Sequence, residues 1–161
     1  MPTDEWYTTQ DVVDMAIKIL SPAANSIIMC PFDTDKSLFV KTLKEAGHTV
    51  IYSVRDFVGS KHYEFDYVVT NPPFSIKDNV IETVFAYGKR TVLVLPLDSL
   101  SGLKRRRLYQ NHEFPQIYMP SRRYSYMDEN YVKRSGSNFA SIIMTLNHGA
   151  KSEITWELIN A

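Results

Sequence analysis

The sequence predicts an α/β fold built on a mostly parallel central sheet with helices on both faces. Short apolar runs alternate with longer stretches whose apolar residues recur at helical spacing, which is the pattern of strand–helix–strand units. The run from Thr91 to Pro96 is apolar almost throughout, as expected of a central strand that is covered on both faces. Ligands in such folds bind at the carboxyl ends of the strands.

The first elements follow from apolar spacing and from the residues that interrupt it. Residues 9–20 carry apolar side chains on one helical face, and Ser21-Pro22 ends that helix. The apolar run at 26–30 predicts a buried strand. A second amphipathic helix is predicted at 36–46, where a glycine follows it, and a strand at 48–52 completes the unit.

The rest of the chain repeats this alternation. A polar loop precedes a strand predicted at 65–70, and a helix at 78–87 is closed by Gly88. The strand at 91–96 leads to a helix predicted at 100–109. The remaining predicted strands cover residues 116–119, 138–146 and 154–158, the last as an edge strand.

Length and composition favour one domain spanning residues 1–161, without a separate target-recognition domain. Hydrophobic residues make up 44% and charged residues 22%, and no apolar run approaches the ~20 residues that span a bilayer. The polar N-terminus is unlike a secretory signal, so we expect a cytoplasmic protein. A single cysteine, Cys30, and four scattered histidines predict no metal site.

The stretch Asn71-Pro72-Pro73-Phe74 stands at the end of the strand predicted at 65–70. Consecutive prolines cannot continue a hydrogen-bonded ladder, and the residue before a proline is biased towards an extended conformation. The corner should therefore hold an amide, a carbonyl and an aromatic ring in fixed directions, which suits a flat ligand with an exocyclic amine. The plain alternative is a strand-ending turn with a buried phenylalanine.

This tetrapeptide resembles that of S-adenosylmethionine-dependent amino-methyltransferases, especially the adenine-N6 DNA methyltransferases. The resemblance implies a Rossmann-like methyltransferase fold, with S-adenosylmethionine as cofactor. It further implies that Asn71 and Pro72 accept hydrogen bonds from the target amine. Phe74 would stack on a base that has left the duplex.

Further segments are similar to the cofactor-binding parts of this family, with departures. Tyr7 and Thr8 resemble the aromatic-Thr segment before the first helix, although a plain capped helix is equally compatible. Pro31 and Phe32 match the loop after the first strand, but both glycines are missing and Cys30 stands where an acid is expected.

Acidic residues offer weaker matches to the same family. Asp33 and Asp35 remain in this loop, either to hold the cationic amine of the cofactor or to cap the following helix. Asp56 and Phe57 resemble a pair that contacts the cofactor adenine, and a loop acid beside a core aromatic is the alternative.

Net charge is zero, but basic residues cluster between residues 104 and 123. Cations there would contact phosphates, and cations interleaved with aromatics suit single strands or a flipped base. A solvated helix face is the commoner origin of such a run. The candidate nucleic-acid contacts are Lys104, Arg105, Arg106, Arg122, Arg123 and Tyr124.

These features together predict methyl transfer to adenine N6 in DNA, with a protein partner as one source of target recognition. Two alternatives remain open. The missing glycines favour a catalytically silent, methyltransferase-like module that binds nucleic acid. An active enzyme could also act on RNA or on a protein amide.

Overall fold

A seven-stranded sheet forms the centre of the molecule, in the order β10-β6-β9-β5-β4-β2-β3. The computed structural model describes residues 7–120, 126–128, 130, 132–134 and 140–157. Neighbouring strands are parallel except where β9 pairs with β5 and β6. The strands are β2 (Ile27–Cys30), β3 (Thr49–Tyr52), β4 (Tyr67–Thr70), β5 (Thr91–Pro96), β6 (Gln116–Pro120), β9 (Ser141–Leu146) and β10 (Ile154–Glu157).

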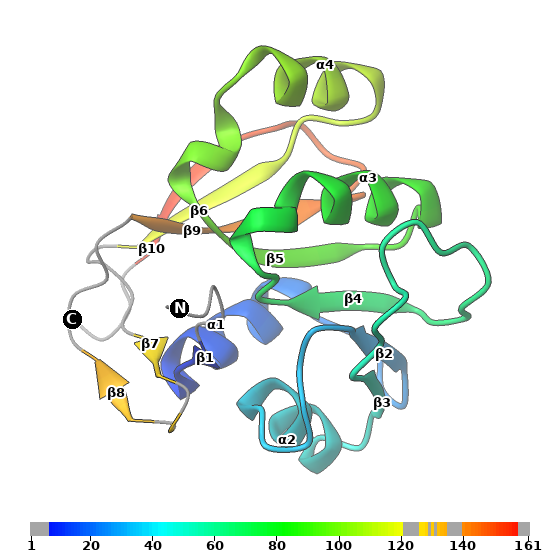
Figure 1. The fold of residues 1–161 in the computed structure, drawn as a ribbon, viewed down its shortest axis with the longest axis vertical. Helices are drawn as coiled ribbons and strands as arrows, with labels where there is room; N and C mark the ends of the chain where they lie inside the picture. The colour runs from blue at the N-terminus through cyan, green and yellow to red at the C-terminus, as the bar shows by residue number, and fades with distance from the viewer. Residues whose placement is uncertain (1–6, 121–125, 129, 131, 135–139, 158–161) are drawn as a thin grey trace.

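Helices cover both faces of this sheet, as predicted (Figure 1). Helices α1 (Gln10–Leu20) and α2 (Leu38–Glu45) lie against one face, and α3 (Lys77–Tyr87) and α4 (Leu103–Asn111) lie on the other. Single-turn helices η1 (Phe74–Ile76) and η2 (Leu97–Leu100) precede α3 and α4. The predicted elements are therefore present, with ends displaced by a few residues.

Alternation along the strands divides the core into two layers. Val69 and Val92 pack with the buried face of α1, whereas Val68 and Leu93 pack with the buried face of α3. Successive side chains of a strand point to opposite faces, so a strand covered on both sides must be apolar throughout. Every residue of β5 is buried, which confirms the prediction for that strand.

A second, small sheet of β1 (Tyr7–Thr8), β7 (Tyr126–Met127) and β8 (Lys133–Arg134) was not predicted. Two-residue strands are too short to show a period, so sequence alone does not reveal them. In Figure 1 this sheet lies to the left of α1, near the end of the molecule where β4 and β5 finish.

Candidate functional site

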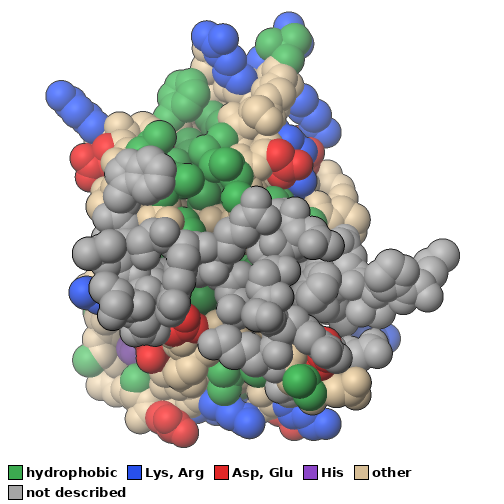
Figure 2. Space-filling model, turned by 90° about the vertical axis from the view of Figure 1, so that its left-hand side faces the viewer, with side chains coloured by type: hydrophobic (Ala, Val, Ile, Leu, Met, Phe, Trp, Pro, Cys, Tyr) green, Lys and Arg blue, Asp and Glu red, His purple; other side chains and the backbone are tan. Residues whose placement is uncertain are grey.

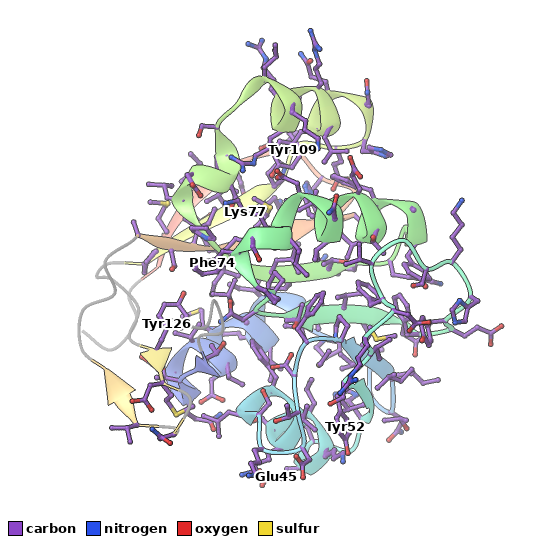
Figure 3. All side chains as sticks on the ribbon, viewed as in Figure 1. Glu45, Tyr52, Phe74, Lys77, Tyr109 and Tyr126 are labelled. Atoms are coloured by element: carbon purple, nitrogen blue, oxygen red, sulfur yellow. The ribbon has the colours of Figure 1, made fainter. Side chains whose placement is uncertain are left out.

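The turn after β4 is a stiff corner at the carboxyl edge of the sheet. Pro72 is buried, while Asn71 and Phe74 are half-buried. Pro73 has an extended backbone (φ −56°, ψ 131°), and its carbonyl accepts a hydrogen bond from the Ile76 N–H at 3.2 Å. Figure 3 shows Phe74 at the start of the turn that leads into α3. The two prolines fix the chain direction here without backbone donors.

The loop after β2 is organised by a buried carboxylate. Asp33 is 8% exposed, and its carboxylate accepts hydrogen bonds from Ser37 Oγ at 2.5 Å and from Thr70 Oγ1 at 2.8 Å. Its backbone carbonyl accepts from both the N–H and the hydroxyl of Ser53. Asp33 therefore joins its own loop to the start of α2, to the end of β3 and to the end of β4.

Burial raises the pKa of Asp33 to about 6, and the two hydroxyl donors lower it only in part. Among the described residues, no Lys, Arg or His forms an ion pair with this carboxylate. The neighbouring Cys30 is fully buried, and burial followed by the nearby Asp33 raises its thiol pKa. Burial thus keeps Cys30 in its protonated thiol form, and Asp33 is the buried acid of the loop.

The absence of glycine from this loop has a conformational explanation. No residue from 31 to 37 has a positive φ, so the loop needs no glycine to form. The left-handed residue nearby is Ser53 (φ +55°), which follows β3 and bonds back to Asp33. Hydrogen bonds to Asp33, rather than glycines, therefore set the backbone conformation of this loop.

The small sheet brings the N-terminal segment to the same edge. Thr8 lies opposite Tyr126 in the pairing of β1 with β7. Tyr126 is 1% exposed, and its hydroxyl donates to Ser141 Oγ at 2.6 Å. Ser141 in turn pairs with Pro96 at the carboxyl end of β5. Thr8, β7 and the carboxyl end of β5 are therefore connected through Tyr126 and Ser141. Burial also raises the pKa of Tyr126.

The two residues predicted to contact the cofactor adenine, Phe57 and Asp56, differ in burial. Phe57 is fully buried, stacked on Tyr87 with ring centroids 5.8 Å apart. The half-buried Phe32 forms a T-shaped pair with Phe57, with ring centroids 6.1 Å apart. Asp56 is exposed and accepts a hydrogen bond from Tyr63, a bond that raises the Tyr63 pKa. In this arrangement Phe57 packs against Phe32. Because Phe57 is fully buried, its contact with a ligand would require the loop after β3 to open.

The predicted phosphate contacts also separate into two groups. Lys104 and Arg106 are exposed on α4, as the prediction requires. Arg105 instead bonds Asp78 of α3 at 2.8 Å and donates to the carbonyls of Asp98 and Ser101. Its guanidinium serves to join α4 and η2 to the first turn of α3.

Some predicted residues cannot be placed, and others were missed. Arg122, Arg123 and Tyr124 lie outside the described residues, and of Tyr7 only the backbone is described. Thr70 and Ser37 were missed, although a threonine closing an apolar strand immediately before Asn71 was a usable signal. Lys77, which pairs with Asp98 at 3.4 Å beside the corner, was also missed.

Among the described residues, no cluster of three or more His, Cys, Asp or Glu side chains is arranged to hold a metal ion. Nor does any described helix have both the length and the apolar character needed to cross a bilayer.

Comparison with known proteins gives structural matches. No family model and no curated protein sequence matches the chain. The modification subunit of an enzyme assigned as a type I restriction enzyme from Vibrio vulnificus superposes with a TM-score of 0.59 at 15% identity, over 98% of this chain and 47% of that one. The methyltransferase subunit of a type I restriction-modification system from Streptococcus thermophilus gives 0.59 at 13% identity, over 96% and 47%.

A dimethyladenosine transferase from Plasmodium falciparum gives a TM-score of 0.55 at 13% identity, over 88% of this chain and 62% of that one. The chain therefore spans about half the length of the two type I subunits and less than two thirds of the transferase. At these identities the matches show the fold, which is Rossmann-like and methyltransferase-like. The predicted fold class is confirmed.

Proposed function

We propose that this chain transfers a methyl group from S-adenosylmethionine to the N6 amine of adenine in DNA. The observation that carries the proposal is the position of Asn71-Pro72-Pro73-Phe74. The tetrapeptide ends a central strand of a methyltransferase-like sheet, at the edge where such folds bind ligands. Asn71 and Phe74 are half-buried, and the Asn71 Oδ1 atom itself is buried, so the corner must open for this oxygen to reach an amine. Two of the structural matches are subunits of type I restriction systems, which supports DNA as the substrate.

The residues around Asp33 fit the cationic part of this cofactor. A buried carboxylate that has hydroxyl donors and no described cationic partner is stabilised by a positive charge beside it. We therefore assign Asp33 to the ammonium group of the cofactor, with Pro31 and Phe32 lining the loop. Tyr7 and Thr8 belong to the same end of the site. Asp56 and Phe57 stay assigned to the adenine, on the condition that their loop opens.

The chemistry then depends on orientation. S-adenosylmethionine, when bound, supplies a methyl group that its sulfonium already activates. Asn71, through its side-chain oxygen, and Pro72, through its carbonyl, accept the two N–H groups of the adenine amine, which directs the nitrogen lone pair towards that methyl group. Phe74 stacks on the extruded base and excludes water from one of its faces. The exposed cations Lys104 and Arg106 contact phosphates.

A second candidate is a catalytically silent, nucleic-acid-binding module. The observation that favours it is that the Asp33 carboxylate already accepts two internal hydrogen bonds, in a loop without glycine. On this view the hydrogen bonds replaced the cofactor when binding was lost. A third candidate, an enzyme acting on RNA or on a protein amide, keeps the same site with a different substrate.

Calorimetric titration with S-adenosylmethionine and a labelled methyl-transfer assay separate these candidates. We expect saturable heat, and label that enters double- or single-stranded DNA and is recovered as N6-methyladenine. Absence of heat at saturating concentrations would favour the silent module. Heat with label only in RNA or protein would retain the cofactor and reject DNA as substrate.

A further inference from the structure

Helix α4 buries few of its side chains, and an apolar groove lies between it and the outer strands β6 and β10. The groove has a volume of about 560 Å³, within the range of about 300–1,000 Å³ that is usual for ligand pockets. Tyr109 is the one residue of α4 that is buried. Leu103 is 64% exposed, Ile154 60% and Phe114 46%, and all three line the groove. Exposed apolar side chains that converge on a hollow mark an interaction surface.

The walls of the groove are preformed. The Tyr109 hydroxyl donates to the carbonyl of Ser99 at 2.8 Å, which joins α4 to η2. On the other wall the backbone N–H groups of His148 and Gly149 donate to Glu113, and Ser152 Oγ donates to the carbonyl of Pro115 at 2.5 Å. These bonds join the β9–β10 turn to the segment before β6. Because these hydrogen bonds already hold the walls in place, a partner would bind with little loss of conformational entropy in the groove.

The groove is separate from the residues assigned to the cofactor and the target amine, although its Arg106 is also a proposed phosphate contact. Its lining residues come from η2, α4, the entry to β6 and the entry to β10, and none belongs to the turns after β2 or β4. The inference therefore holds whether or not the chain transfers methyl groups.

The charges around the groove are unbalanced. Lys104, Arg106 and Arg107 are exposed on α4, which carries no acid, and Arg106 lines the groove. Arg105 is neutralised by Asp78. Beside the facing wall, the exposed Lys151 and Glu153 carry opposite charges, and the half-buried Glu113 accepts hydrogen bonds from the His148 and Gly149 N–H groups. Figure 2 shows hydrophobic side chains gathered in the upper part of the face, with Lys and Arg side chains at the top of the molecule, where α4 lies in Figure 1.

We propose that this groove is the docking site for an amphipathic, acidic segment of a partner protein. Apolar side chains of the partner, spaced along one face of a helix, enter between Leu103, Phe114 and Ile154, and its Asp or Glu residues face the cations of α4. Phosphates alone would satisfy the cations but leave the three exposed apolar side chains in water, so a nucleic-acid backbone does not fill the groove. Since Lys104 and Arg106 are also the proposed phosphate contacts, the partner segment and DNA would compete for them.

A selection from a random peptide library displayed on phage tests this proposal with the full chain as bait. We expect enriched peptides with apolar residues at helical spacing interleaved with Asp and Glu. Their affinity should fall at least about tenfold on Leu103→Glu and on Ile154→Glu, which alter opposite walls. The matched control is Val58→Glu, an exposed apolar residue (38%) on the distant loop after β3, which should leave affinity unchanged. Thermal unfolding of each variant confirms that the fold is intact.

Four outcomes would overturn the proposal. Peptides could bind the two groove variants as well as the parent chain, or the enriched sequences could be basic or lack apolar residues. Single-stranded DNA binding that depends on Leu103 and Ile154 would assign the groove to nucleic acid. Concentration-dependent dimers, seen by sedimentation and abolished by Leu103→Glu, would assign it to a second copy of this chain.

Discussion

The turns after β2 and β4 lie side by side at the carboxyl edge of the sheet, yet they are made rigid in different ways. The turn after β4 owes its stiffness to Pro72 and Pro73, which act through their own covalent geometry. The turn after β2 depends on Asp33, whose hydrogen-bond partners are 4, 20 and 37 residues away in the sequence. Local rigidity is visible in a sequence, whereas rigidity from contacts appears only when the chain is folded.

The difference bears on what a missing motif means. A loop that lacks the glycines of a family pattern looks defective in sequence. Here the same loop has no left-handed residue, and the Asp33 carboxylate and carbonyl each accept hydrogen bonds, so it is a complete structure of another kind. The two turns are joined by the bond from Thr70 to Asp33, and Thr70 directly precedes Asn71. A change in one turn should therefore be detectable in the other.

The largest expected effect comes from the turn after β4. If Asn71 orients the target amine, Asn71→Ala should lower the methyl-transfer rate by about 10²–10³-fold, the usual loss when one preorganised hydrogen-bonding group of an active site is removed. Affinity for S-adenosylmethionine, measured by calorimetry, should stay nearly constant because none of the assigned cofactor contacts lies in the turn after β4.

The matched control for this prediction is Asn79→Ala, which removes an exposed asparagine of α3 and should retain the parent rate. Both variants should unfold within a few degrees of the parent chain, since substitutions outside the core cost little. Equal transfer rates for Asn71→Ala and the parent chain would remove Asn71 from the mechanism.

Most of the fold could be predicted from the sequence because most of the long elements have a clear apolar pattern; the polar helix α4 is an exception. The all-apolar run of β5 and the amphipathic faces of α1 and α2 were sufficient to predict a covered sheet. The site was predicted only in part. Arg105 looked like its neighbours on α4, and nothing local reveals that Asp78, 27 residues earlier, takes its guanidinium. Phe57 likewise showed its aromatic character in the sequence but not its burial against Tyr87.

The next effect is in the turn after β2 and depends on pH. The pKa of Asp33 rises from 3.8 to about 6 on folding, so the folded chain binds this proton more tightly than the unfolded chain does. The contribution of this group to stability is therefore greatest below about pH 4 and is lost as pH rises to about 6. A shift of about two units corresponds to about 3 kcal/mol, measurable by urea unfolding between pH 4 and 7.

Asp33→Asn removes the titrating group and should flatten this pH dependence. The control is Asp35→Asn, an exposed acid in the same loop, which should keep the parent profile. If Asp33 holds the cofactor ammonium, the affinity of the parent chain for S-adenosylmethionine should also rise as the pH passes upward through 6, and Asp33→Asn should lose that rise. Parent and Asp33→Asn profiles that run parallel from pH 4 to 7 would contradict the assigned burial of Asp33.

The smallest expected effect tests the bond that joins the two turns. Thr70 and Thr145 are both fully buried on strands, but Thr70 donates to Asp33, whereas Thr145 Oγ1 has no hydrogen-bond partner among the described residues. Valine replaces a hydroxyl by a methyl group of similar size. At pH 7 Thr70→Val should destabilise the fold by about 1.5–3 kcal/mol, the usual value for a hydrogen bond to a charged group, and Thr145→Val should be neutral or stabilising.

The loss from Thr70→Val should shrink below pH 4, where Asp33 is protonated and the bond becomes one between neutral groups. Urea unfolding of both variants at the two pH values measures this; a penalty for Thr70→Val that is independent of pH would mean that the two turns are not coupled through Asp33.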